Sequence, residues 1–278
     1  MTATTTAMPD TVRLGFGRLL RSEWIKLRSI RSTWWCYAIL VVVTVGMAAL
    51  LGNAVGVPGP DQPKDALSGG FVNINTASVT LTALVVGVLG VLIITGEYGT
   101  GQVRSTFTAD PRRTGVVLAK ATVLAVTTFV VSVVSTWIGV LLSAALQSAQ
   151  GAEIVVGDPS VFLPILGSSV YVTLLALLAY GIGLLLRSSA GGIAVTVGIL
   201  LVLPILLSGI GTLMAQQWVL DIAKFLPDQA GMQLYTYSYT GLQQDGVVLN
   251  GWGGFAVLAA EVVVVGALAL TVARRRDV

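Results

Sequence analysis

The chain has 278 residues, of which 55% are hydrophobic and 10% are charged, and its mean hydropathy is +0.86. Soluble domains carry about a quarter charged residues, so an ordinary water-soluble enzyme is excluded and much of the surface must face lipid. High hydrophobicity also excludes a disordered chain. Cys36 is the only cysteine and histidine is absent, which excludes a disulfide framework and the histidine-dependent zinc proteases and serine hydrolases.

The chain opens with a threonine-rich stretch over residues 1–11, for which we expect a disordered tail. Residues 12–278 are predicted to form one transmembrane domain. The first apolar run starts only at Trp34, which is too far from the N-terminus for the hydrophobic region of a cleavable signal peptide. We therefore expect the first span to be retained.

Residues 12–30 predict an amphipathic helix, because Phe16, Leu20 and Trp24 recur at four-residue steps. Such a helix would lie in the headgroup plane with its cationic side toward anionic lipid. The alternative is a simple basic flank to the first span. The residues assigned to this interfacial helix are Arg18, Arg21, Glu23, Trp24, Lys26 and Arg28.

Six apolar runs are long enough to cross a bilayer core of about 30 Å as helices. Runs of this length favour helices over the shorter alternating strands of a membrane barrel. The predicted spans are about 34–53, 78–96, 116–146, 161–186, 191–213 and 252–272. A five-span arrangement would bury Arg187 inside the membrane, at a cost of a few kcal/mol, so residues 187–190 are predicted to form a tight turn.

The basic residues fall almost entirely on one side of these spans. Fourteen of the sixteen lysines and arginines precede the first span, follow the second, or occupy the turn at Arg187 and the C-terminal tail; Lys64 and Lys224 lie on the other side. This bias predicts that both termini are cytoplasmic, in the inner membrane of the cell. The positive charge then forms cytoplasmic belts rather than a nucleic-acid face.

Two of the connecting segments have unusual composition. Residues 97–113 are longer than a helix connection needs and mix acidic, aromatic and basic groups, which indicates a cytoplasmic docking surface or an ordinary solvated loop. On the external side, residues 67–77 and 214–251 are mixed rather than plainly hydrophilic. The second of them fits a pair of short re-entrant or interfacial helices that turn near Pro227 or Gly231.

The chain resembles the permease subunits of type-2 ATP-binding-cassette exporters. The resemblance rests on four short motifs whose order and position relative to the six spans match. These are Ser22-Glu23-Trp24-Ile25-Lys26-Leu27-Arg28-Ser29 before span one, Gly96-Glu97-Tyr98-Gly99-Thr100-Gly101 after span two, Pro111-Arg112-Arg113 with Leu118-Ala119-Lys120 at span three, and Leu226-Pro227-Asp228-Gln229-Ala230-Gly231 before span six.

The resemblance implies a role for each soluble piece. The N-terminal helix would be an elbow on the inner leaflet, and the segment after span two a coupling helix that enters a groove of an ATPase subunit. The coupling residues would be Glu97, Tyr98, Thr100 and Arg104, with Arg112 and Arg113 on the far flank. Residues 214–251 would cover the external exit of the transport route. In the coupling segment the chain has Gly99 at a position where relatives often carry a basic residue.

The candidate pathway or gate residues are Glu261, Thr80, Pro204 and Ser208. Glu261 lies near the centre of the last span, where a carboxylate is costly and is a functional hypothesis by default. It can instead form a structural hydrogen bond, or lie at a different depth than expected. The other three lie on spans two and five, which line the route in the family, although small and hydroxyl residues equally serve helix packing in lipid.

The full sequence contains no G-x-x-x-x-G-K-[ST] motif, so we expect no ATP site in this chain and no enzymatic activity of its own. ATP and Mg²⁺ would be held by a separate ATPase, present in two copies, and a second permease chain would complete a homodimer or heterodimer. The predicted class is an all-α membrane protein with six transmembrane helices, an interfacial helix, a coupling helix and external re-entrant helices.

The favoured function is export of a hydrophobic or amphipathic compound such as a drug, lipid or peptide, with multidrug resistance as one outcome. The alternative is a non-transporting membrane anchor or immunity-type protein. An intramembrane enzyme built on Glu261 is disfavoured, because no second carboxylate lies in mid-span.

Overall fold

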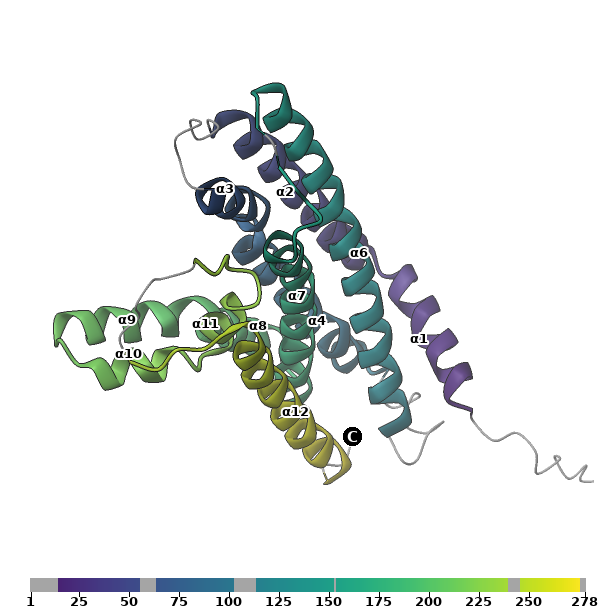
Figure 1. The fold of residues 1–278 in the computed structure, drawn as a ribbon. Coiled ribbons are helices and arrows are strands. Elements are labelled where there is room, and N and C mark those ends of the chain that lie inside the picture. Colours follow the sequence, from purple (N-terminus) through teal and green to yellow (C-terminus); the bar gives the residue numbers. More distant parts are fainter. Residues whose placement is uncertain (1–14, 56–63, 103–113, 153, 240–245, 276–278) are drawn as a thin grey trace, which may run out of the picture.

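The computed structural model describes residues 15–55, 64–102, 114–152, 154–239 and 246–275, and these ranges contain helices and no strand (Figure 1). Within them, six helical segments are long and apolar enough to cross a membrane. The all-helical class and the number of spans are therefore confirmed. The predicted tail over 1–11 lies outside the described residues.

The helices that form the six spans agree with the predicted ranges, with their ends shifted by a few residues. They are α2 (Arg31–Ala54), α4 (Val79–Thr100), α6 (Thr114–Ala149), α7 (Pro159–Leu186), the run of α8 (Ser189–Val197), η1 (Gly198–Val202) and α9 (Leu203–Leu213), and α12 (Gly251–Arg275). Before α2 lies α1 (Phe16–Ser29).

The predicted tight turn between spans four and five is present, and local chemistry explains it. Helix α7 ends at Leu186 because Arg187 adopts a left-handed conformation with φ 54°, a common way to close a helix. Helix α8 begins two residues later, where the side chain of Ser188 accepts a hydrogen bond from the Gly191 N–H. A serine at this position satisfies a free amide of the first turn.

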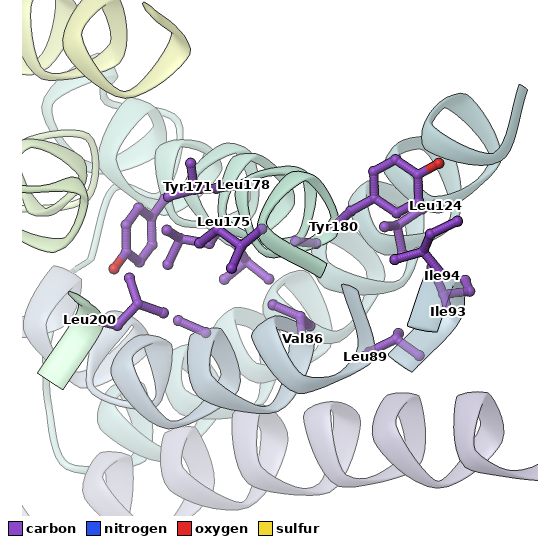
Figure 2. Packing of buried hydrophobic residues seen from close by; sticks show 14 of the residues in the cluster. Val86, Leu89, Ile93, Ile94, Leu124, Tyr171, Leu175, Leu178, Tyr180 and Leu200 are labelled. Carbon is purple, nitrogen blue, oxygen red and sulfur yellow. The ribbon is translucent and has the colours of Figure 1, made fainter. Parts of the chain in front are cut away.

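Helices α4 and α7 form the centre of the bundle. Val86, Leu89 and Ile93 on α4 and Leu175 and Leu178 on α7 are all buried in one hydrophobic cluster, part of which Figure 2 shows. By contrast, most residues of span five and of α12 are not buried in the isolated chain, whereas most residues of the span that contains α4 are buried. The last two spans are therefore peripheral in the isolated chain.

Residues 67–77, which the sequence placed in a mixed external stretch, belong mostly to a helix, α3 (Lys64–Thr76). Its Phe71 and Val72 are buried in a second hydrophobic cluster with Val161, Ile165 and Tyr237. The sequence does not indicate a helix here, because asparagine and glycine have low helix propensity. The helix forms because α7 and the chain near Tyr237 cover its apolar residues.

Span five is interrupted in its middle. The Leu203 N–H donates to the carbonyl of Gly198, five residues earlier, which defines a π turn. Pro204 follows immediately and has no N–H to offer the preceding turn. Pro204 therefore follows directly on a local widening of the helix, and π turns of this kind often mark functional segments.

Two short helices, α10 (Gln217–Ala223) and α11 (Pro227–Met232), occupy the predicted external stretch. Helix α10 runs back along α9, and Figure 1 shows the two as a hairpin that extends away from the body. Helix α11 packs instead against α12. Re-entry of these helices into the membrane stays a prediction.

We call the end of the bundle that contains α1, the C-terminus of α4, the N-terminus of α6 and the α7–α8 turn the basic end. The opposite end contains α3, α10 and α11 (Figure 1).

Candidate functional site: an ion-pair network at the basic end

The face of α1 that packs against the bundle is not the stripe of Phe16, Leu20 and Trp24, for which the sequence predicts contact with the membrane. Phe16 and Trp24 are 47% and 43% exposed, whereas Glu23 and Leu27 are buried. The helix therefore presents a carboxylate, rather than its aromatic residues, to the rest of the bundle. Position at the membrane interface, which the exposed aromatic and basic residues favour, stays a prediction.

Four charged side chains from three helices form a closed network. Lys26 of α1 donates to Glu23 of the same helix over 2.8 Å and to Glu97 of α4 over 3.1 Å. Lys120 of α6 donates to Glu97 over 2.8 Å and also to Glu23. Each lysine therefore bridges both carboxylates, and the four formal charges sum to zero.

Three members of this network are removed from solvent. The side chains of Lys120, Glu23 and Glu97 are 4%, 4% and 8% exposed, while that of Lys26 is 30% exposed. Burial disfavours the charged form of Lys26, but the carboxylates of Glu23 and Glu97 outweigh it and raise the pKa of this lysine. Buried ions keep their charge only when they are paired, and loss of one partner is costly.

The last turns of α4 are also tied to spans four and five. The guanidinium carbon of Arg187 lies 5.1 Å from the centre of the Tyr98 ring, within the range of a cation–π contact. One turn earlier, the hydroxyl of Ser189 donates to that of Thr95 over 2.8 Å. The end of α4 is therefore held by ions on one side and by the α7–α8 turn on the other.

A further bond fixes α7 to α6 near the network. The hydroxyl of Tyr180 donates to the carbonyl of Val117 over 3.1 Å, one turn from Lys120. A buried tyrosine hydroxyl generally needs such a partner. Helices α1, α4, α6, α7 and α8 consequently meet in one polar cluster at the basic end.

The structure brings together residues that the sequence assigned to two separate pieces. Glu23 and Lys26 were assigned to the interfacial helix, and Glu97 and Tyr98 to the coupling segment. Thr100 is exposed and bonds the carbonyl of Gly96 in its own helix. Three further predicted coupling residues, Arg104, Arg112 and Arg113, lie outside the described residues.

The other interfacial residues stay outside the network. Arg18, Arg21, Trp24 and Arg28 are exposed, and the guanidinium carbon of Arg28 lies 6.0 Å from the centre of the Trp24 ring. This stacking covers part of the indole on the outer side of α1. It leaves the inner side to Glu23 and Leu27.

Lys120 and Arg187 are site residues that the sequence analysis did not select as such. Lys120 is the only charged residue within the 36 residues of α6, and a single ionisable group in a membrane span is a functional hypothesis by default. Glu23 carried a related clue, because it lies on one helical face with Leu20 and Leu27. Neither clue identifies the partner.

The candidate gate residues do not form one site. Thr80 lies on α4, Pro204 and Ser208 on α9, and Glu261 on α12, and hydrogen bonds in the described part of the chain join none of the four to another. Atom Oε2 of Glu261 is buried and accepts no hydrogen bond from the described residues. Their role in a pathway stays a prediction.

The network is a charge-neutral cluster in which both lysines donate to both carboxylates. The described residues also hold no group of three side chains suited to bind a metal ion.

Comparison with known proteins gives a family match that covers these helices. The family described as ABC-2 family transporter protein matches residues 19–205, which run from α1 through the network to the start of α9. No curated protein matches the chain. With two thirds of its length matched, and with six apolar helices, the chain belongs to the ABC-2 transporter family and is a multi-pass membrane permease of the ATP-binding-cassette class.

Proposed function

We propose that this permease is the membrane subunit of an ATP-driven exporter and that the ion-pair network couples its spans to an ATPase. Glu97 lies in the last turn of α4, and residues 103–113 lead directly from it to α6. The observation that carries the proposal is the double link of Lys26 and Lys120 to Glu97. A push on the segment after α4 would therefore reach α1 and α6 together.

The energetics of burial explain why these helices would move as one body. Separating Glu97 from its lysines would leave charges of both signs unpaired in a poorly solvated place, which costs several kcal/mol. A path that keeps the network intact costs less. Motion of the α4 terminus is then expected to rotate α1, α4 and α6 jointly, with Tyr98–Arg187 and Thr95–Ser189 passing part of it to α7 and α8.

The distribution of charge supports the orientation that this function requires. The basic end carries the network, Arg187 and the arginines of α1, and lysines and arginines concentrate on the cytoplasmic side of membrane proteins. We place the basic end and both termini in the cytoplasm of the cell and the protein in its inner membrane. Two copies of the ATPase would then bind ATP and Mg²⁺ beneath it.

A second permease chain is proposed because span five has little cover in the isolated chain. Exposed apolar side chains on it include Ile205 at 61% and Leu213 at 89%. Another permease, identical or homologous, packed there would bury this surface and enclose a route between the two chains. The transported compound would be hydrophobic or amphipathic, since the exposed surfaces of span five that would line the route are apolar.

Purification of the intact membrane complex, followed by mass measurement and an ATPase assay, tests the proposal. We expect an ATPase subunit to be retained. Arg104→Glu should release it, because the loop after α4 would dock there. Lys120→Met should retain the ATPase subunit but lose both the stimulation of ATP hydrolysis by substrate and the associated flux. The reason is that this substitution breaks the ion-pair network and leaves the docking surface unchanged.

Lys224→Met is the matched control, since it breaks a partly exposed ion pair with Asp221 at the opposite end. This variant should keep both assembly and stimulation. If no ATPase is retained and flux is absent, the non-transporting anchor becomes the better explanation. Retention with normal stimulation in Lys120→Met would remove the network from the mechanism.

A further inference from the structure

A cavity of 390 Å³ lies at the opposite end of the bundle, far from the ion-pair network. Its walls are the first three turns of α7, the chain that follows α11 and the first turns of α12. The volume falls within the range of small-molecule sites, about 300–1,000 Å³. Most of the lining is apolar, with Leu163, Val170 and Phe255 among the side chains that form it.

Close backbone packing builds the floor of this groove. A Cβ atom on Gly167 of α7 would lie 2.0 Å from the carbonyl oxygen of Leu234, and one on Gly254 of α12 would lie 2.2 Å from that of Ala230. The two glycines therefore let the segment 230–236 wedge between the two helices. The walls above this wedge open sideways, because Leu163 and Trp252 are 59% and 81% exposed.

Two of the three walls, α7 and α12, are candidate membrane spans, so on the proposed membrane placement the opening would face lipid rather than water. Trp252 lies in the first turn of its span, the level at which tryptophans mark the membrane boundary. The apolar chain of a lipid-like ligand could enter from the side while the polar head group of that ligand stays near the N-terminus of α7. The geometry is that of a site for an amphiphile.

The polar groups around the groove are mainly acceptors of hydrogen bonds. The N–H groups of residues 233–236 all donate within their own turn, to the carbonyls of Ala230, Gly231 and Met232. Pro164 lies inside α7 and has no N–H, so the carbonyl of Ser160, which also lines the groove, loses its usual partner. This carbonyl favours a ligand that donates a hydrogen bond.

Asp158 adds a negative charge beside this end of the groove. It is exposed and immediately precedes Pro159 and Ser160, which line the groove. The N–H and the hydroxyl of Ser160 both donate to its Oδ1, over 2.9 and 2.8 Å, and these bonds lower the pKa of Asp158, the backbone bond most. Among the described residues, its Oδ2 accepts no hydrogen bond.

We propose that this groove binds a single-chain amphiphile with a protonated amine as its head group, the chain between α7 and α12 and the ammonium near Asp158. A full carboxylate charge with neighbouring carbonyl acceptors complements a cationic donor. The first amides of α7, which would favour an anion, are already occupied by Asp158. The inference deepens the proposed export function by naming a ligand class, and it rests on that function only for the membrane placement.

Binding is tested with the purified full-length permease in nanodiscs, without an ATPase, using radiolabelled dodecylamine as the probe. Dodecanol and dodecyl sulfate are the neutral and anionic comparisons. The unmodified protein should bind dodecylamine most tightly and dodecyl sulfate least. Equal or tighter binding of dodecyl sulfate would overturn the cationic assignment.

Filling the groove should block the chain. Leu163→Trp is expected to weaken dodecylamine binding at least tenfold, and Val170→Phe provides a second filling variant should the first fold poorly. Leu141→Trp is the matched control, because Leu141 is 68% exposed on α6 and does not line the groove. Unchanged binding in folded Leu163→Trp and Val170→Phe would overturn the site.

Asp158→Asn keeps an oxygen that caps α7 but removes the charge. It should weaken dodecylamine binding severalfold and leave dodecanol binding unchanged. An equal loss for both probes would mean that Asp158 acts only through the fold. The binding assay contains no ATPase, so its result does not depend on export. If the protein does not export but binds dodecylamine, the proposed groove is still supported. If it exports but does not bind dodecylamine, only the groove proposal is contradicted.

Discussion

Lys120 and Lys26 contact the same two carboxylates, but they differ in burial, with side chains 4% and 30% exposed. A buried charge whose partner is removed destabilises a protein by about 3–5 kcal/mol, whereas exposed ion pairs contribute about 0–1 kcal/mol. The two positions therefore separate the effect of burial from that of pairing.

The first prediction is that Lys120→Met lowers the free energy of unfolding by about 3 kcal/mol or more, and that Lys26→Met lowers it by about 1 kcal/mol or less. The reason is that Lys120→Met leaves only the partly exposed Lys26 to pair with Glu23 and Glu97, whereas Lys26→Met leaves the buried Lys120 in contact with both carboxylates. Titration with sodium dodecyl sulfate in mixed micelles measures both values. Equal losses at the two positions would contradict the burial argument.

Asp221 holds the chain before α12 onto α10. Its Oδ1 accepts from the Val247 N–H over 3.1 Å, from Lys224 over 3.1 Å and from Gln217 over 3.4 Å. The backbone bond from Val247 has the largest effect, followed by that from Lys224, and together they lower the pKa of Asp221. A carboxyl with a lowered pKa stabilises the folded state when it is ionised.

The second prediction follows from the sign of that shift. The contribution of Asp221 is fully present above the pKa of the unfolded state, about 4, and is lost as the pH falls through the lower folded value. Protection of the Val247 amide against hydrogen exchange should therefore drop in acid. Asp221→Asn should show weak protection already at neutral pH, and strong protection in that variant would refute the assignment.

At the scale of elements, the pairing of α4 with α7 depends on one close approach. A Cβ atom on Gly90 would lie 2.3 Å from the carbonyl oxygen of Ala176 and 3.1 Å from the backbone nitrogen of Tyr180. These contacts are with backbone, which cannot move aside as a flexible side chain does. Larger residues would have to separate the two central helices.

The third prediction is that Gly90→Ala destabilises the permease by about 1–3 kcal/mol, read as a lower midpoint of thermal unfolding in detergent. Gly46→Ala on α2 is the control, because a Cβ atom there meets nothing within 4 Å. That variant should unfold at the original temperature or slightly above it. A similar loss in both variants would show that helix flexibility, and not the α4–α7 contact, sets the stability.

The spans were predictable from the sequence because the bilayer imposes a length on every apolar helix. The turn at Arg187 was predictable for the same reason, since a charge there could not be buried cheaply. Helix α3 was not predicted, because its apolar residues are few and are covered by distant residues of α6 and α7 and by Tyr237. The π turn was also hidden, although Pro204 marked its neighbourhood.

The candidate site could be predicted only in part, since its residues come from distant parts of the chain. Glu23 and Lys120 are 97 positions apart, and the sequence around either residue does not identify the other as its partner. Periodicity on α1 predicts which residues face the membrane but not which residue faces the bundle, and pairing with Lys120 gives that place to Glu23. Charge neutrality of the final cluster is a property of three helices together.

At the scale of the whole molecule, the proposed function depends on which side of the membrane the basic end occupies. The network, the α7–α8 turn, the C-terminus of α4 and the N-terminus of α6 all belong to this end. An ATPase can supply energy only from the cytoplasm, so the account requires the basic end to face it. The groove between α7 and α12 must then open toward the outer leaflet.

Labelling of single cysteines measures this orientation most directly. In a Cys36→Ala background, Ser105→Cys reports the segment after α4, and Ser148→Cys reports the opposite end, where Ser148 is exposed at the end of α6. An impermeant maleimide should label Ser148→Cys in intact cells and Ser105→Cys only in inside-out vesicles. Labelling of Ser105→Cys in intact cells would place the basic end outside and contradict both the coupling role and the export function.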